Sequence, residues 1–170
     1  MSAHAMPVQK PGRSKQDYGT PWELIHAVEK RWGRLSIDLA ASETNAKAPL
    51  FISAEDDYLK QPVGPELKCG LSWCNPPFEN LAPWADKWRL DSQAGARIIA
   101  LTPASVGANW FANSICRTIA GTGIADIRFA RVITLSPRIT FEGCTDPYPK
   151  DCMLTLWGID EPGFEFWRWK

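Results

Sequence analysis

The sequence predicts an α/β fold built on a mostly parallel sheet, with helices on both faces and an antiparallel hairpin at one edge. Short apolar runs that are typical of buried strands alternate along the chain with stretches of helical periodicity. Two late runs, Met153–Trp157 and Phe164–Trp169, flank a turn-rich segment and predict the edge hairpin. The length of 170 residues suits one domain with a core of its own.

Composition divides the chain into residues 1–17 and residues 18–170. The first segment is rich in Pro, Gly, Lys and Ser, which predicts a mobile basic arm. The second carries the periodic patterns and is expected to form the single domain. Hydrophobic residues make up 45% of the chain, charged residues 22%, and the formal net charge is +0. Any contact with nucleic acid must therefore come from a local patch rather than from a global field.

The first expected helix begins beside a proline. Thr20 is a suitable N-cap, Pro21 suits the first helical position, and Glu23 completes the helix-start pattern. An apolar stripe follows until Gly33 ends the helix. The sequence then predicts a strand with its exit loop over 35–40, a weak strand over 49–52, an acidic loop over 55–57 and, after a polar loop, a buried strand over 70–74.

The second half of the chain continues the alternation. An amphipathic helix is expected from Asn80 to about Gln93, followed by a buried strand over 96–101 that Thr102-Pro103 closes. A further helix is expected over 107–119. Strand-like runs then occupy residues 127–129, 133–135 and 138–141.

Several protein classes are disfavoured by the sequence. The five cysteines are odd in number and form no C-x-x-C pair, which indicates neither a disulfide framework nor a zinc site. A reducing compartment and no bound metal are expected. No apolar stretch is long enough to span a membrane, and the first residues lack the apolar segment of a signal peptide. A cytoplasmic location is therefore expected, while the oligomeric state is left open.

The most informative local feature is Asn75-Pro76-Pro77-Phe78, which directly follows the strand over 70–74. Two prolines remove two backbone donors, so no strand continues, and Asn75 is held extended with its side chain away from the sheet. The Asn75 amide, a carbonyl of Asn75 or Pro76 and the Phe78 ring suit an amino group on a planar heterocycle. Ligands bind at the carboxyl ends of strands in such sheets. A plain structural turn is the alternative interpretation.

Several short segments also occur in a characteristic order along the chain. The strongest are Gly19–Trp22, Asp38–Ser42 with Asn45–Lys47, and Trp73–Phe78, and weaker ones are 101–104 with 109–111 and 135–141. In this order and spacing the chain resembles the phage-type DNA N6-adenine methyltransferases, which are small Dam-like enzymes that use S-adenosylmethionine. The resemblance covers residues 18 to about 157.

The resemblance implies a Rossmann-like class I methyltransferase fold and assigns roles by position. Asn75 and the Pro76 carbonyl would accept hydrogen bonds from the adenine amine, Pro77 belongs to the same catalytic tetrapeptide, and Phe78 would stack on the base. The implied cofactor-binding residues are Thr20, Pro21, Asp38, Ala40, Ala41, Ser42, Glu55, Asp57 and Leu59. Which acid of 55–57 faces the cofactor ribose stays open.

The implied DNA contacts are Arg138 and Asn109. Arg138 is a candidate for a phosphate, although an isolated arginine is more often solvated at the surface. The acids of 55–57 have the same alternative, a solvated loop, and Asp38 at the end of its strand could simply cap the turn that follows. The cofactor loop carries Ala40, Ala41 and Ser42 in place of a Gly-x-Gly sequence, which limits how closely its backbone approaches a ligand.

Elementary chemistry agrees with these roles. The adenine amine is delocalised into its ring and is a poor nucleophile, so two acceptors that favour a more tetrahedral nitrogen act on the transition state. A duplex hides this amine, so the base must be flipped out. No general base is required, which fits the two histidines: His4 lies in the arm, and His26 is expected on a helix surface.

The predicted function is transfer of a methyl group from S-adenosylmethionine to adenine N6 in DNA, by a protein of phage or prophage origin. Two alternatives stay open. The same tetrapeptide would serve another planar amine, such as an RNA base or a protein glutamine. An inactive fold that binds cofactor or DNA is the other. Little chain is left for a recognition domain, so a loose or short DNA site is expected.

Overall fold

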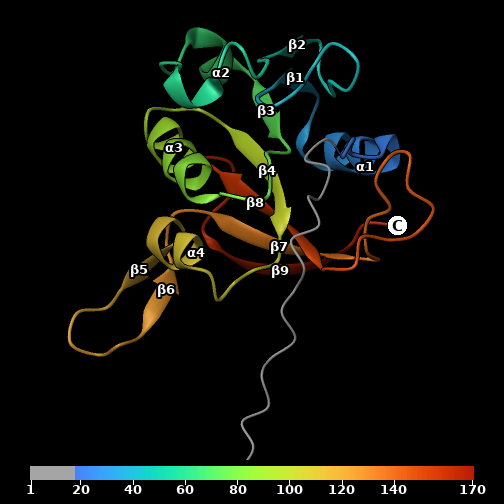
Figure 1. Cartoon of the computed structure of the whole chain (residues 1–170). Helices are drawn as coiled ribbons and strands as arrows, with labels where there is room; N and C mark the ends of the chain where they lie inside the picture. The colour runs from blue at the N-terminus through green and yellow to red at the C-terminus, as the bar shows by residue number, and fades with distance from the viewer. Residues whose placement is uncertain (1–17) are drawn as a thin grey trace, which may run out of the picture.

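The computed structural model describes residues 18–170, and the arm expected over 1–17 lies outside the described residues. Figure 1 shows a twisted central sheet with helices packed around it. In chain order the elements are α1 (Trp22–Trp32), β1 (Leu35–Asp38), β2 (Leu50–Phe51), the 3-10 helix η1 (Tyr58–Lys60), α2 (Pro65–Cys69), β3 (Leu71–Cys74), α3 (Ala82–Gln93), β4 (Ile98–Pro103), α4 (Asn109–Ser114), β5 (Cys116–Thr118), β6 (Ala125–Ile127), β7 (Arg131–Ser136), β8 (Cys152–Trp157) and β9 (Gly163–Arg168).

Among the described residues, the main sheet has seven strands in the order β2-β1-β3-β4-β8-β7-β9. All of them run in one direction except β8, which is antiparallel to both β4 and β7. The predicted α/β fold with a mostly parallel, Rossmann-like sheet is therefore confirmed. One detail is corrected, because β8 and β9 do not pair as a hairpin. Both edges of β8 are occupied, so β9 pairs in parallel with β7 at the edge of the sheet.

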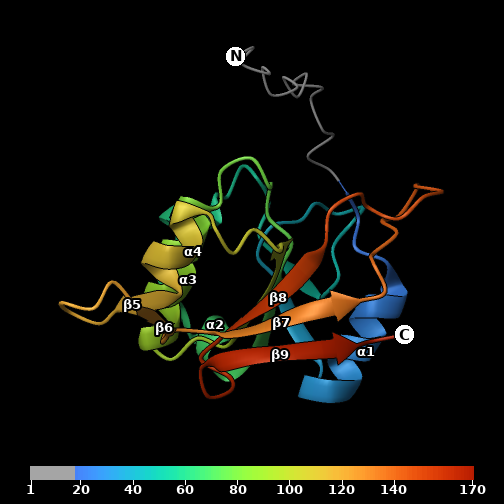
Figure 2. The same ribbon diagram turned by 90° about the horizontal axis from the view of Figure 1, so that it is seen from below.

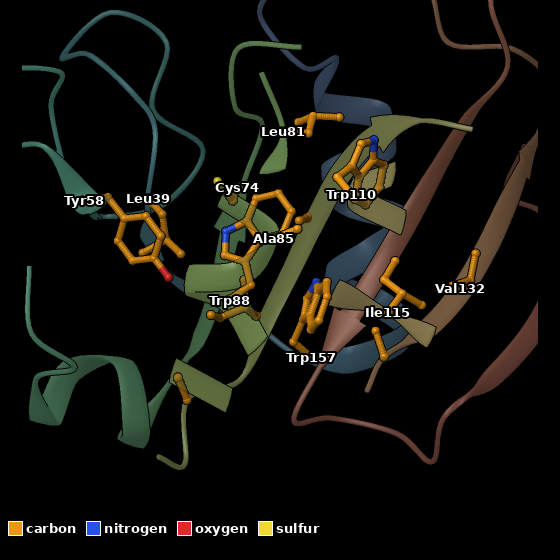
Figure 3. Close-up of a cluster of buried hydrophobic side chains, with 14 of the residues drawn as sticks. Leu39, Tyr58, Cys74, Leu81, Ala85, Trp88, Trp110, Ile115, Val132 and Trp157 are labelled. Carbon is orange, nitrogen blue, oxygen red and sulfur yellow. The ribbon is translucent and has the colours of Figure 1, made fainter. Parts of the chain in front are cut away.

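Helices cover both faces of the sheet, as expected: α1 lies on one face, and α2, α3 and α4 lie on the other (Figure 2). Side chains alternate between the two faces along the buried strands. On β4, Ile99 and Leu101 join the cluster beneath α1, whereas Ile98 and Ala100 face the cluster beneath α3 and α4. Figure 3 shows the second cluster, in which Trp88 packs near Trp157 with ring centroids 6.0 Å apart. The core is thus two apolar layers separated by the sheet.

The order of the strands reverses between β1 and β3. The chain passes outward from β1 to β2 and then returns to place β3 on the other side of β1. Such a reversal leaves a crevice at the carboxyl ends of the two central strands. Asp38 ends β1 and pairs in register with Trp73 of β3, two residues before Asn75. The fold thus brings the loop after Asp38 and the tetrapeptide that begins at Asn75 to the same edge of the sheet.

The first helix agrees with the prediction except at its start. α1 begins at Trp22, Pro21 is its N-cap, and no side chain from residues 18–170 caps it. The predicted N-cap role of Thr20 is therefore wrong, since Thr20 precedes the cap and its buried hydroxyl has no hydrogen-bond partner within residues 18–170. Gly33 ends the helix as predicted, with φ 103° and its N–H donating to the carbonyl of Glu29.

Other segments differ from the predicted elements. The helix expected over 107–119 ends at Ser114, because the chain turns there into the antiparallel β5–β6 hairpin. Residues 138–141 form a loop rather than a strand, since Ile139 and Phe141 pack beneath α1 instead of pairing with a neighbour. η1 and α2 occupy the expected polar loop, and α2 has Gly64 as its N-cap and Pro65 as its first residue, which is typical of a helix start. No helix within residues 18–170 combines the length and apolar character needed to cross a membrane.

Candidate active site

A cavity of about 610 Å³ opens at the carboxyl ends of β1 and β3. This volume falls within the range of roughly 300–1,000 Å³ that is usual for small-molecule sites. Its lining comes from the segment before α1, the loop after β1, the segment between β2 and η1, and the residues after β3. The cavity is therefore built by the strand reversal described above, where the sequence predicted a ligand site.

Asn75 lies in this lining with its side chain in a defined orientation. Its Nδ2 donates a 2.7 Å hydrogen bond to the backbone carbonyl of Tyr18, which precedes α1. Because the amide nitrogen is committed to that carbonyl, the amide oxygen is the atom left for a ligand. Within residues 18–170, no donor is hydrogen-bonded to this oxygen. The Asn75 side chain thus points away from its own backbone, as predicted, while its role as an acceptor for a ligand stays a prediction.

Phe78 belongs to an aromatic cluster beside the cavity rather than to its lining. Its ring lies edge-to-face against Phe141 and Tyr148, with centroids 6.4 Å and 6.0 Å away. Tyr18 stacks on Phe141 at 5.3 Å and is shared between the main cavity and a second, smaller one beside Tyr148. The loop over 142–150 therefore borders the space next to Phe78.

Asp38 organises the loop that follows β1. One carboxylate oxygen accepts from the backbone N–H of Ala40 at 3.3 Å, and the other accepts from that of Lys47 at 3.0 Å. Burial raises the pKa of Asp38 to about 6, although these backbone donors and the nearby Lys47 lower it. The carboxylate thus holds both ends of the loop, as a turn-capping acid does. Within the loop, Ser42 and Asn45 bond to each other.

The acidic segment after β2 gives its three acids different environments. Asp56 accepts from the backbone and hydroxyl of Ser53, and these hydrogen bonds lower its pKa. Asp57 has φ 50°, caps η1 and pairs with Lys60, which lowers its pKa. Glu55 lines the cavity and has no protein hydrogen-bond partner within residues 18–170. Among the three, Glu55 is the acid whose oxygens stay available to a ligand.

A buried polar group holds η1 against α3. The Tyr58 hydroxyl donates to Asp91 at 2.7 Å, and Lys87 pairs with the same carboxylate at 2.6 Å. Burial and the hydrogen bond to Asp91 both raise the pKa of Tyr58, so its hydroxyl stays protonated. The Tyr58 ring lines the cavity and stacks against Trp84 with centroids 5.8 Å apart. Both residues line the cavity, so aromatic side chains form part of its wall.

The residues predicted from the sequence fall into two groups. Those that line the cavity are Thr20, Asp38, Ala40, Ala41, Ser42, Glu55, Asp57, Asn75 and Pro77. Those outside the lining are Pro21, Leu59, Pro76, Phe78, Arg138 and Asn109. Leu59 packs against the core, Pro76 is buried, and Arg138 is paired with Asp151 at 2.7 Å on the surface. Asn109 is exposed at the first position of α4.

Some lining residues were not predicted. Lys47, Tyr58 and Trp84 line the cavity, as does Trp73. Lys47 belongs to a segment that carried the family resemblance, but its contacts lie far away in the sequence. Trp84 follows the helical pattern of α3, so its periodicity indicated only the core. For the tryptophans, the only signal in the sequence is their unusual number of nine.

Comparison with known proteins decides the family. The model of the family described as DNA N-6-adenine-methyltransferase (Dam) matches residues 8–144, which is most of the chain and includes the described cavity. The chain belongs to this family. The resemblance expected from the order of the short segments is therefore confirmed.

One curated relative of this Dam-family chain is a DNA N-6-adenine-methyltransferase of Escherichia phage T1. It is 33% identical over 94 residues, which cover 55% of this chain and 38% of the phage protein. The match thus spans little more than a third of the relative's length. Within residues 18–170, no group of three or more His, Cys, Asp or Glu side chains is arranged to hold a metal ion.

Proposed function

We propose that the chain transfers a methyl group from S-adenosylmethionine to the exocyclic N6 of adenine in DNA, as a protein of phage or prophage origin. The observation that carries the proposal is the orientation of Asn75. Its amide nitrogen is held by the Tyr18 carbonyl, so its amide oxygen is left as an acceptor beside a cavity of cofactor size. Membership of the Dam family supports adenine as the methylated base.

The residues around the cavity fit the cofactor. Thr20 Oγ1 and Trp73 Nε1 are buried without a hydrogen-bond partner within residues 18–170, and both residues line the cavity. Buried polar atoms without partners are costly, so a polar ligand that bonds to them is favoured. Glu55 would accept from the ribose hydroxyls, and Tyr58 with Trp84 would lie against the purine. When bound, S-adenosylmethionine supplies an electrophilic methyl carbon on its sulfonium.

The chain's own contribution to the chemistry is orientation and hydrogen bonding. Asn75 Oδ1 and the Pro76 carbonyl would accept the two N–H bonds of the adenine amine, which favours a tetrahedral nitrogen with a directed lone pair. Two prolines and the bond to Tyr18 keep these acceptors in place before the substrate arrives. Preorganised acceptors of this kind favour the transition state without a general base.

The target base must leave the duplex to reach Asn75. Phe78 would stack on the flipped base. Because the Phe78 and Tyr148 rings are in contact, Tyr148 and its loop would have to move aside. Arg138 and Asn109 remain candidates for DNA contacts. The ion pair of Arg138 with Asp151 is exposed, with side chains 52% and 67% accessible, so little free energy opposes its exchange for a phosphate.

A labelling experiment tests the proposal against its alternatives. The full chain is incubated with cofactor carrying a labelled methyl group and with DNA, RNA or protein in parallel. We expect label in DNA, at adenine N6 after digestion to nucleosides. Label in RNA or protein alone would assign the site to another planar amine. Cofactor binding without transfer to any polymer would identify an inactive binding fold.

A second measurement addresses sequence preference. We expect methylation at short or loosely defined sites, because the strands and helices of the α/β fold extend from Trp22 to Arg168 within the described residues 18–170. Mapping of methylated adenines in DNA from cells that express the chain tests this. A long and strictly observed site would contradict it.

A further inference from the structure

Lys47 is the only cation among the described residues that line the cavity. The lining also contains four carboxylates, those of Asp38, Glu43, Glu55 and Asp57. A ligand group of negative charge therefore has a single favourable ionic partner in this cavity. The cofactor of the proposed function carries one such group, the α-carboxylate of its methionine part.

The ammonium of Lys47 is buried, and Glu142, with which it forms an ion pair, is more exposed. The Lys47 side chain is 4% exposed, and its Nζ donates to both carboxylate oxygens of Glu142 at 2.8 Å and 2.9 Å. The same Nζ lies 4.7 Å from the ring centroid of Trp22. A buried cation requires a partner, whereas the Glu142 side chain is 39% exposed. Solvent can therefore take over Glu142 at small cost if another carboxylate reaches Lys47.

The ion pair lies next to the groups that surround Asn75. The backbone N–H of Glu142 donates to the carbonyl of Gly19 at 2.9 Å. The Glu142 carboxylate occupies the space that a Cβ at Gly19 would fill. Gly19 lies between Tyr18, whose carbonyl accepts from Asn75, and Thr20, whose buried hydroxyl has no partner among the described residues 18–170. The Lys47 ammonium, the free Thr20 hydroxyl and the methyl-acceptor site thus meet around residues 18–20.

We propose that Lys47 binds the α-carboxylate of the cofactor and that this carboxylate competes with Glu142 for the ammonium. The inference rests on the proposed function, because it presupposes an S-adenosyl cofactor. The exchange breaks no covalent bond and keeps the buried cation paired throughout. Thr20 supplies a hydroxyl donor to the same carboxylate. Glu142 becomes a residue that sets cofactor affinity without contacting the cofactor.

A pair of ligands separates this role from general damage to the site. S-adenosylhomocysteine carries the α-carboxylate, whereas 5′-methylthioadenosine has the same nucleoside and thioether without the amino-acid part. Calorimetric titration of the full chain measures both affinities. We expect Lys47→Met to weaken binding of S-adenosylhomocysteine roughly tenfold or more, as for a hydrogen bond to a charged group. Binding of 5′-methylthioadenosine should not change. Lys30→Met, an exposed change of the same charge on α1, should alter neither affinity.

Glu142→Gln gives a prediction of opposite sign. Removal of the competing carboxylate should strengthen binding of S-adenosylhomocysteine and leave that of 5′-methylthioadenosine unchanged. It also leaves the buried ammonium without its negatively charged partner, so the variant should melt at a lower temperature than wild type. Addition of S-adenosylhomocysteine should raise that melting temperature more than it raises that of wild type. This variant carries the test if Lys47→Met does not fold.

The outcomes separate this inference from the function on which it rests. If wild type binds both ligands and neither variant changes the ratio of the two affinities, the assignment of Lys47 is wrong and the cofactor site survives. If wild type binds neither ligand, the proposed function fails and this inference fails with it. The ratio in question is the affinity for S-adenosylhomocysteine divided by the affinity for 5′-methylthioadenosine. A higher ratio for Glu142→Gln together with a lower ratio for Lys47→Met supports the exchange of carboxylates at Lys47.

Discussion

Tyr58, Asp91 and Lys87 form a buried hydrogen-bonded group beside the cavity. The loss of stability on breaking this group can be predicted quantitatively. Asp91 is 4% exposed and accepts from Tyr58 at 2.7 Å and from Lys87 at 2.6 Å. Lys87→Met removes the cation and leaves a buried carboxylate with one side-chain donor. Loss of one partner of a buried ion pair costs about 3–5 kcal/mol. For a domain of this size, that lowers the melting temperature by roughly 6–20 °C.

Urea unfolding and thermal melting of wild type and Lys87→Met measure this loss. The double variant Lys87→Met/Asp91→Asn removes the uncompensated charge but keeps an oxygen that can accept from Tyr58. It should therefore be more stable than Lys87→Met alone. Arg138→Met is the matched control, because it breaks an exposed pair and should cost less than about 1 kcal/mol. A double variant less stable than Lys87→Met would refute the reasoning, as would equal losses for Lys87→Met and the control.

Three further predictions concern the cavity and the turns beside the sheet. Between pH 4 and pH 6 the folded state binds a proton at Asp38 that the unfolded state does not, because the pKa of Asp38 is raised from 3.8 to about 6. The free energy of unfolding should therefore fall by about 3 kcal/mol as the pH rises through this window. In urea unfolding, the free energy of unfolding of Asp38→Asn should not show this fall. The same pH dependence in both proteins would contradict the prediction. Thr20→Val removes a buried hydroxyl that has no partner in the part of the chain that the structure describes, so thermal melting should show a more stable protein while titration shows weaker cofactor binding. Tighter binding would be inconsistent with the site. Gly158→Ala should destabilise more than Gly123→Ala, since both have φ +68° but only at Gly158 does a Cβ meet a backbone carbonyl, that of Ala96; equal melting temperatures would count against this.

The central part of the fold could be predicted because short stretches of sequence specify its elements. The strand before Asn75 is a short apolar run ended by two prolines, and α1 is a clear apolar stripe ended by Gly33. The partners of β8 and β9 depend instead on which strand edges are free after the rest of the sheet has formed. No local pattern contains that information. For the same reason the extent of α4 was overestimated, because the β5–β6 hairpin follows it directly.

The candidate site shows the same division. The position of Asn75 follows from proline geometry, and the position of Asp38 follows from the end of an apolar strand. The contacts that give these residues their environment are long-range. Asn75 bonds to Tyr18, which is 57 residues away, and Lys47 pairs with Glu142 across 95 residues. Contacts of this kind arise only from the folded arrangement, so the sequence alone gives Lys47 no role.

The most direct test of the proposed mechanism is the rate of methyl transfer by Asn75→Ala in a single turnover, together with its affinity for the cofactor. We expect the rate to fall by roughly a hundredfold or more, as when one preorganised group is removed from a transition state, while cofactor affinity is largely retained. Asn80→Ala, an exposed change five positions away, should behave as wild type. Transfer at the wild-type rate, or loss of cofactor binding together with activity, would contradict the role given to Asn75.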